Sequence, residues 1–314
     1  MGALSRRVTS MPKLDGTDLD VFPLCLGGNV FGWTADEAAS FAVLDAYAAA
    51  GGNFIDTADT YMRPHMGTSE TIIGRWLVAR GNRDQMVIAT KVGSDGGLSA
   101  RNVAEHAEGS LRRLQTDRID LYYSHKDDLA VPVEETLGAF DALVQAGKVR
   151  HIGASNLSGE RVVESLRASA RESLARYVAL QPHYNLVERE RYEREYAPIV
   201  AEHDLAVAPY YALAKGFLTG KYREGWPAVD SPRAEAARAY LDERGRAVLD
   251  DLDEIAADHG VTMAAVALAW LKSRPGVVAP IASARNVEQL DHLLPMAELT
   301  LTGDELARLE TSSR

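Results

Sequence analysis

The 314-residue chain contains only one cysteine, Cys25. A single cysteine cannot form a disulfide within its own chain, and it cannot supply the thiolate cage of a structural zinc ion. The sequence therefore predicts a protein with no internal disulfide and no metal site.

Basic residues are scarce relative to acidic ones, because 34 Lys and Arg stand against 45 Asp and Glu, a formal net charge of −11. A nucleic-acid surface needs clustered Lys and Arg that outweigh the acidic residues around them. The charge balance therefore argues against a nucleic-acid partner, although a few local basic residues can still hold a small phosphate.

Long apolar runs are also missing. No uninterrupted apolar stretch approaches the length that spans a bilayer, and the N-terminus lacks the apolar core of a secretory signal. We therefore expect a cytoplasmic protein with no membrane partner.

What the chain does contain is a regular alternation of two patterns. Short, mainly apolar runs predict strands at 23–28, 53–58, 86–91, 119–125, 149–155, 177–183, 206–212 and 277–282. Between them, apolar residues at spacings of three and four predict helices, the first five at 36–50, 69–80, 99–114, 133–146 and 159–173.

This alternation predicts an α/β fold in which parallel strands are buried on both faces. Eight strands match a closed (β/α)8 TIM barrel better than an open sheet, and chains of this length form such barrels as one domain. The first strand-to-helix turn also lacks the Gly-x-Gly-x-x-Gly fingerprint of open dinucleotide-binding sheets. We therefore predict a single barrel domain over 1–314, with an N-terminal β-hairpin and extra C-terminal helical segments.

Two segments outside this alternation have their own signals. An Asp-Gly turn within 11–20 predicts the hairpin, which we expect to cover the bottom of the barrel. The segment 222–233, with two prolines and mixed charges, predicts a long loop on the rim. Whether that loop closes as a lid is left open.

Four polar residues lie at or just beyond the carboxyl ends of three of the predicted strands. Asp56 and Tyr61 come after the run 53–55, Lys91 follows 86–90, and His125 follows 119–124. In a barrel, the carboxyl ends of different strands converge on one rim, whatever their separation along the chain. The sequence therefore predicts that Asp56, Tyr61, Lys91 and His125 meet in one site.

The segments that carry these residues resemble the aldo-keto reductase family. They read FIDTADTY at 54–61, IATK at 88–91 and DLYYSH at 120–125, in the family's order, and the resemblance extends over nearly the whole chain. It implies an NADP-dependent oxidoreductase that reduces a small-molecule aldehyde or ketone to an alcohol by hydride transfer.

The resemblance makes Tyr61 the general acid that protonates the carbonyl oxygen. A phenol with a pKa of about 10 needs a nearby cation to favour its phenolate, and Lys91 supplies one. Asp56 would pair with Lys91 and keep it charged, and His125 would orient the carbonyl. Taken singly, each of the four also fits a structural role, namely a helix cap, rim packing, a solvated lysine and a buried histidine, so the prediction depends on their meeting.

The resemblance also implies where the nicotinamide end of NADP would bind. The residues concerned lie at or near the carboxyl ends of the first, fifth, sixth and seventh predicted strands, and they are Gly28, Asn29, Ser155, Asn156, Gln181 and Tyr210. Tyr210 would stack on the nicotinamide ring, and Ser155, Asn156 and Gln181 would bind its carboxamide. Trp33 would lie beside the substrate carbonyl, with ordinary rim packing as the alternative.

The remaining part of NADP would contact the loop after the seventh strand and the segment after the last one. This set is Tyr211, Leu213, Gly216, Lys221, Ala282, Ser283, Arg285 and Gln289. Because an arginine fork matches a 2′-phosphate, Ser283 and Arg285 predict a preference for NADPH over NADH. An exposed arginine that caps its helix is the alternative.

The sequence departs from the family pattern at two places. The family more often has Ser-Pro-Leu where this chain has Tyr211-Ala212-Leu213, which leaves a hydroxyl contact to the pyrophosphate open at position 211. Many members carry Glu-Asn where this chain has His292 and Leu293, which leaves part of the adenine contact open.

Two other classes of function remain. Potassium-channel β subunits, which resemble this family, keep the barrel and the cofactor but serve as regulatory subunits. A barrel aldolase would instead use Lys91 as a Schiff-base nucleophile, although Asp56 would favour the charged amine, which does not attack. The oligomeric state and the physiological substrate are open at this level.

Overall fold

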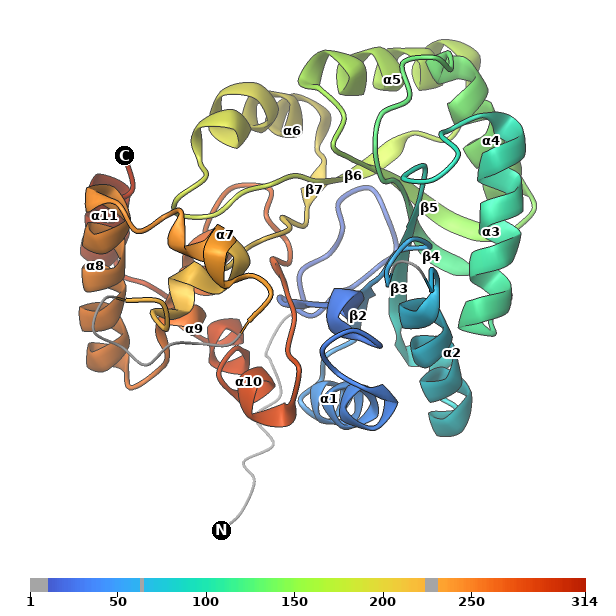
Figure 1. The fold of residues 1–314 in the computed structure, drawn as a ribbon. Coiled ribbons are helices and arrows are strands. Elements are labelled where there is room, and N and C mark those ends of the chain that lie inside the picture. The colour runs from blue at the N-terminus through green and yellow to red at the C-terminus, as the bar shows by residue number, and fades with distance from the viewer. Residues whose placement is uncertain (1–10, 63–64, 224–230) are drawn as a thin grey trace.

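The computed structural model describes residues 11–62, 65–223 and 231–314. Its parallel strands form one sheet in the order β7-β6-β5-β4-β3-β2-β1-β8, which curls so that β8 lies beside β1 (Figure 1). The strands are β1 (Cys25–Gly27), β2 (Phe54–Asp56), β3 (Val87–Val92), β4 (Ile119–Ser124), β5 (Val149–Ser155), β6 (Tyr177–Gln181), β7 (Ala206–Val207) and β8 (Ile281–Ala282).

Backbone hydrogen bonds also link β7 to the segment that leads into β8. Val207 N–H donates to the Gly276 carbonyl oxygen at 2.8 Å, and Val278 N–H donates to the Val207 carbonyl oxygen at 3.0 Å. Ile281 N–H donates to the Pro209 carbonyl oxygen at 2.9 Å. The eight-stranded curled sheet is therefore consistent with the predicted (β/α)8 barrel.

All eight predicted strands are present, but several are shorter than their apolar runs. β7 has two residues where the pattern predicted 206–212, and β8 has two where it predicted 277–282. Ala208 and Ala212 stay buried although they lie beyond the last residue of β7. An apolar run indicates that a segment is buried, not that it pairs as a strand. The predicted strands were therefore too long where the chain stays buried after it leaves the sheet.

The first five helices agree with their predicted bounds to within one residue at each end. They are α1 (Glu37–Ala49), α2 (Thr68–Arg80), α3 (Ala100–Leu114), α4 (Val133–Gln145) and α5 (Gly159–Glu172). Side-chain oxygens of Asp36, Ser99 and Ser158 accept backbone N–H groups at the starts of α1, α3 and α5. These caps satisfy free N–H groups at three of the five starts, whereas α2 and α4 begin without a side-chain cap.

Further helices follow in the second half of the chain, including the predicted C-terminal segments. They are α6 (Ala197–His203), α7 (Ala234–Arg238), α8 (Glu243–His259), α9 (Met263–Lys272), α10 (Val287–Asp291) and α11 (Gly303–Ser312). A π-helical turn, η3 (Tyr192–Tyr196), precedes α6, and 3₁₀ turns lie at η1 (Gly28–Val30), η2 (Arg83–Gln85), η4 (Ala214–Thr219) and η5 (Leu294–Ala297).

The predicted hairpin is a tight turn closed by an antiparallel bridge between Lys13 and Asp20. Its Leu14 and Leu19 are buried in one cluster with Phe54 and Val87, the first residues of β2 and β3. The hairpin thus covers the end of the sheet at which the strands begin, as the sequence predicted.

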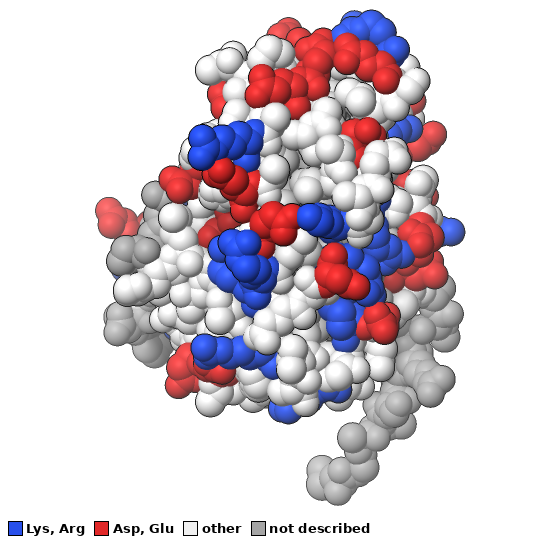
Figure 2. All heavy atoms as spheres, turned by 90° about the vertical axis from the view of Figure 1, so that its right-hand side faces the viewer, with Lys and Arg blue, Asp and Glu red and all other residues white. Residues whose placement is uncertain are grey.

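The helical face that carries α3 and α4 mixes both signs of charge, and Figure 2 shows Lys and Arg interspersed with Asp and Glu there. On α3, for example, Arg101 pairs with Glu105 at 2.7 Å, and Glu108 pairs with Lys148. Within the described residues, no helix is long and apolar enough to cross a membrane.

Candidate functional site

A cavity of about 960 Å³ opens where the strands end. Its lining includes the last residues of five strands, namely Gly27, Asp56, Ser155, Gln181 and Ala282. Because the strands are parallel, these ends lie on one rim. The strand topology therefore accounts for the position of the cavity.

Lys91 lies fully buried beside this cavity and brings three predicted residues together. Its Nζ donates to Asp56 Oδ2 at 2.6 Å, to the Thr57 carbonyl oxygen at 2.7 Å and to the Tyr61 hydroxyl at 3.1 Å. Three acceptors match the three hydrogens of an ammonium group. The lysine is thus held in one position by Asp56 and Tyr61, which the sequence analysis placed around it, and by the Thr57 carbonyl oxygen, which it did not.

These contacts keep Lys91 charged. Burial would lower the pKa of Lys91, but Asp56 and Tyr61 together outweigh it and raise that pKa to about 12. The pKa of Tyr61 is raised because burial disfavours the phenolate more than Lys91 favours it. Tyr61 therefore carries its proton at neutral pH and can donate it.

His125 lies against Tyr61, with ring centroids 6.1 Å apart and planes at 76°. Burial, together with the charges of Lys91 and Lys126, lowers the pKa of His125 to about 3. The ring is therefore neutral at neutral pH. Its Nδ1 is buried and has no hydrogen-bond partner among the described residues, although a ring nitrogen ordinarily finds one.

Gln181 makes a contact that the sequence did not reveal. Its Nε2 donates to Asp56 Oδ1 at 2.8 Å, so both carboxylate oxygens of Asp56 are bound, one by Lys91 and one by Gln181. The two residues are 125 positions apart, and no local pattern connects them.

Ser155 and Asn156 continue this network along the rim. Ser155 Oγ donates to the Gln181 carbonyl oxygen at 2.8 Å. Asn156 Nδ2 donates to Ser155 Oγ at 3.0 Å and to the His125 carbonyl oxygen at 2.9 Å. The residues predicted around a nicotinamide carboxamide thus form one connected group.

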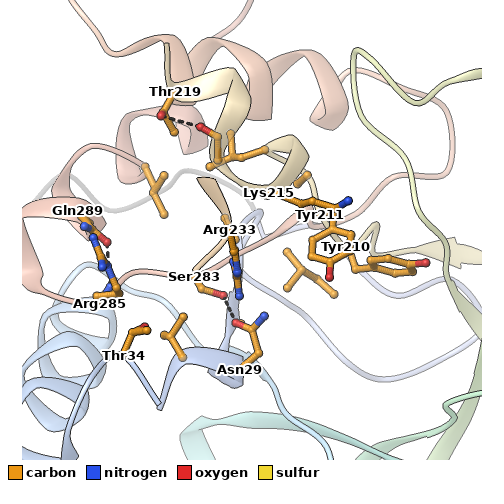
Figure 3. Close-up of a pocket in the computed structure, with 18 of the residues that line it drawn as sticks. Asn29, Thr34, Tyr210, Tyr211, Lys215, Thr219, Arg233, Ser283, Arg285 and Gln289 are labelled. Carbon is orange, nitrogen blue, oxygen red and sulfur yellow. Dashed lines mark hydrogen bonds between the residues drawn. The ribbon is translucent and has the colours of Figure 1, made fainter. Parts of the chain in front are cut away.

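Two consecutive tyrosines follow β7 on this rim. Tyr210 stacks on His183 with ring centroids 5.3 Å apart and planes at 14°, and its hydroxyl donates to Asn156 Oδ1 at 2.9 Å. Tyr211 exposes 39% of its surface and has φ of +50°. Figure 3 shows both tyrosines at one side of the cavity, with Arg285 and Gln289 at the other.

On the side of the cavity that carries Arg285 and Gln289, the loop after β1 contacts the segment after β8. Ser283 Oγ donates to Asn29 Oδ1 at 2.7 Å (Figure 3). Arg285 donates its backbone N–H to Gln289 Oε1 at 3.0 Å. Within the described part of the chain, the guanidinium of Arg285 has no hydrogen-bond or ion-pair partner, which leaves it available to an anion.

Most residues expected to bind cofactor or substrate line the cavity: Asn29, Trp33, Ser155, Asn156, Gln181, Tyr210, Tyr211, Leu213, Gly216, Lys221, Ala282, Ser283, Arg285 and Gln289. Gly28 does not, and its neighbour Gly27 takes that place. The Gly28 carbonyl oxygen instead accepts from Ser69 Oγ of α2 at 2.7 Å.

Several lining residues were missed, among them Thr34, Lys215, Thr219, Arg233 and Thr262. Arg233 ends the predicted rim loop, and its guanidinium carbon lies 5.4 Å from the Trp33 ring centroid. Residues 224–230 of that loop lie outside the described residues, so closure of a lid stays a prediction. The prolines marked the loop, but nothing local indicated which of its side chains reach the cavity.

The sequence predicted no metal site, and such a site would need several ligand side chains close together. Across 11–62, 65–223 and 231–314, no group of three or more His, Cys, Asp or Glu side chains is arranged to hold one.

The sequence of this chain is similar to those of other proteins. The model of the aldo/keto reductase family matches residues 23–314. The chain is 36% identical to the uncharacterized oxidoreductase YrpG of Bacillus subtilis (strain 168), over 94% of this chain and 93% of that protein. It is 33% identical to norsolorinic acid reductase B of Aspergillus parasiticus, over 93% of this chain and 81% of that protein. It is 32% identical to a probable voltage-gated potassium channel subunit beta of Arabidopsis thaliana, over 88% of each.

Proposed function

The chain belongs to the aldo/keto reductase family, and on that premise we propose that it reduces an aldehyde or ketone to an alcohol with NADPH. The observation that carries this proposal is the contact of a buried, charged Lys91 with both Asp56 and Tyr61 beside the cavity. We also infer that the curled sheet closes as a (β/α)8 barrel and that the chain forms one domain.

In this proposal Tyr61 protonates the carbonyl oxygen of the substrate. The Lys91 ammonium, 3.1 Å from the Tyr61 hydroxyl, stabilises the phenolate that remains. Asp56 holds that ammonium in place and keeps it charged. His125, which is neutral and lines the cavity, orients the carbonyl by hydrogen bonding.

The residues around the cavity fit a nicotinamide dinucleotide. Ser155, Asn156 and Gln181 form a connected polar group suited to a carboxamide, and NADPH, when bound, supplies the hydride. At the other side, the unpartnered guanidinium of Arg285 and the hydroxyl of Ser283 suit a 2′-phosphate. This is our reason for proposing NADPH rather than NADH.

The test is Tyr61→Phe, which removes only the hydroxyl. We expect carbonyl reduction, followed by the absorbance of NADPH with aromatic aldehydes, diketones and keto sugars, to fall by about 10²–10⁴-fold. NADPH affinity, measured by fluorescence titration, should be retained. Tyr240→Phe is the matched control because Tyr240 does not line the cavity. Undiminished reduction by Tyr61→Phe would refute the assignment.

A regulatory subunit is the second candidate, favoured by the similarity to proteins named potassium channel β subunits. It predicts tight NADPH binding with negligible reduction of every carbonyl in the panel. The aldolase alternative is disfavoured because Lys91, with a pKa of about 12, is an ammonium at neutral pH and not a nucleophile. Borohydride trapping of a Lys91 adduct would reverse that judgement.

A further inference from the structure

His183 lies behind Tyr210, on the side away from the cavity proposed for NADPH. The two rings are stacked, with centroids 5.3 Å apart and planes at 14°. Tyr210 lines that cavity, where Figure 3 shows its ring, whereas His183 does not line it. Because His183 covers one face of the Tyr210 ring, the opposite face is the one on which a nicotinamide can stack.

Hydrogen bonds hold the stacked rings in register. His183 and Tyr210 pair in a parallel bridge between the segments that follow β6 and β7. Tyr210 N–H donates to the Pro182 carbonyl oxygen at 2.9 Å, and the Tyr210 hydroxyl donates to Asn156 Oδ1 at 2.9 Å. The Tyr210 ring is thus held at its backbone, at its hydroxyl and on one face, so contacts within the protein determine where its free face lies.

The fully buried Asn185 favours a neutral His183. Its Oδ1 accepts from Val187 N–H at 2.9 Å, and its Nδ2 donates to the Tyr211 carbonyl oxygen at 3.0 Å, which fixes the orientation of the amide. The same Nδ2 lies 3.4 Å from His183 Nε2. Since an amide nitrogen of this kind only donates, His183 Nε2 is the acceptor and carries no proton.

The charges around His183 favour the same neutral state. Burial is the largest cause that lowers the pKa of His183, the cations of Lys215 and Arg191 lower it further, and the Glu188 carboxylate acts in the opposite direction. Its ring contacts are with the two tyrosines that follow β7. The pKa of His183 therefore lies below its ordinary value of 6.5, and the ring becomes a cation only in acid.

We propose that His183 is a positioning residue for the nicotinamide ring, because it backs Tyr210 and thereby fixes the plane on which that ring stacks. An uncharged ring behind Tyr210 leaves the electron-rich face of the phenol available to the cationic nicotinamide of NADP⁺ as well as to the neutral one of NADPH. A protonated His183 would place a positive charge behind that face and disfavour NADP⁺ selectively. This inference rests on the proposed function and on the predicted stacking of Tyr210.

The first test compares His183→Phe, which keeps a flat ring, with His183→Ala, which removes it. The dissociation constant of NADPH is measured by fluorescence titration. His183→Ala should weaken NADPH binding about two- to tenfold, whereas His183→Phe should stay within about twofold of wild type. Unchanged binding in His183→Ala would overturn the proposal. Equal weakening in both variants would overturn it too, because a stacked ring would then not be what matters.

The second test needs only wild type and His183→Phe, and it measures the ratio of the NADP⁺ to the NADPH dissociation constant from about pH 8 to about pH 5. The 2′-phosphate also titrates in this range, but both cofactors carry it, so its effect cancels in the ratio. His125, with a pKa of about 3, titrates below the range. The wild-type ratio should rise about threefold or more as the pH falls below about 6.5, and the His183→Phe ratio should stay constant.

His203→Gln is the matched control, because His203 does not line the cavity and its loss should leave the wild-type rise intact. A wild-type ratio that does not change with pH, or an equal rise in His183→Phe, would overturn the proposal. Failure of the proposed function gives a different result, since no carbonyl would then be reduced although both binding tests succeed. Binding of neither cofactor to wild type would overturn the proposal and the proposed function together.

Discussion

His125 shows how burial sets the state of a single functional residue. Its pKa of about 3 results from burial and from the nearby charges of Lys91 and Lys126. A neutral imidazole can share a hydrogen bond with a carbonyl oxygen without adding a second cation beside Lys91. In the proposed mechanism, the charged Lys91 thus stabilises the phenolate, and the uncharged His125 orients the carbonyl.

The lowered pKa of His125 predicts a pH dependence of stability. Because the folded pKa lies below the unfolded value of about 6.5, the unfolded chain binds the extra proton more readily. The contribution of His125 is therefore fully present above about pH 6.5 and is lost as the pH falls towards 3. We expect the melting temperature of wild type to fall more steeply with acidification than that of His125→Gln. Parallel curves from calorimetry would contradict the assignment.

Arg285 carries the prediction about cofactor choice. Its guanidinium lines the cavity without a partner among the described residues. Loss of a charge-assisted hydrogen bond in Arg285→Ala should weaken NADPH binding about tenfold or more and NADH binding much less. Titration calorimetry with both cofactors measures this. Arg112→Ala, exposed on α3, is the control, and equal weakening of both cofactors would exclude Arg285 as the selector.

At the scale of elements, the loop after β2 that presents Tyr61 is attached to α3. Asp59, two residues before Tyr61, accepts from or shares a proton with His106 Nδ1 of α3 at 2.6 Å. The Asp59 side chain is almost fully buried, and burial raises its pKa. Its Oδ1 has no partner among the described residues, so His106 is its principal contact to the helix layer.

Removal of this contact should loosen that attachment. His106→Ala leaves the buried Asp59 carboxyl without its partner, and we expect a loss of about 1–3 kcal/mol in the free energy of unfolding. His106→Asn, which keeps a donor near Asp59, should lose less. Urea denaturation of both variants measures the difference. Equal stabilities for the two variants would show that packing, and not the hydrogen bond, is responsible.

At the scale of the whole molecule, a network of buried charges and the proposed active site lie at opposite ends of the strands. Asp120, near the start of β4, is fully buried and accepts from Arg83 at 2.7 Å, from Arg150 at 2.8 Å and from Ile88 N–H at 2.9 Å. Arg150 also pairs with Asp18 of the hairpin at 2.6 Å. One carboxylate thereby ties β3, β4, β5 and the hairpin together, away from the cavity.

Asp120→Ala would therefore remove the buried partner of Arg83 and Arg150, and also a longer contact of 3.9 Å to Arg118. We expect a loss on the order of 3 kcal/mol in the free energy of unfolding, with NADPH affinity unchanged at temperatures where the variant is folded. Asp117→Ala is the control, since that carboxylate is exposed and its removal should change stability by less than about 0.5 kcal/mol. A similar small effect of Asp120→Ala, measured by urea denaturation, would show that the network is not a major source of stability.

The sequence by itself determined the alternation of strands and helices, the starts of the first five helices and the rim on which Asp56, Tyr61, Lys91 and His125 lie. These properties are local, because apolar periodicity, helix caps and positions after strands are all read within a few residues. Because the strands are parallel, their carboxyl ends lie on one rim.

Only the tertiary structure decided how the side chains on that rim meet. Gln181 binds Asp56 across 125 positions, Arg233 reaches Trp33, and Tyr211 is held at positive φ by the buried Asn185. Tertiary packing also decided where β7 and β8 stop, since their apolar runs continue into buried loops. Such contacts depend on the curvature of the sheet and on the paths of the loops over its rim, which no local pattern of residues encodes.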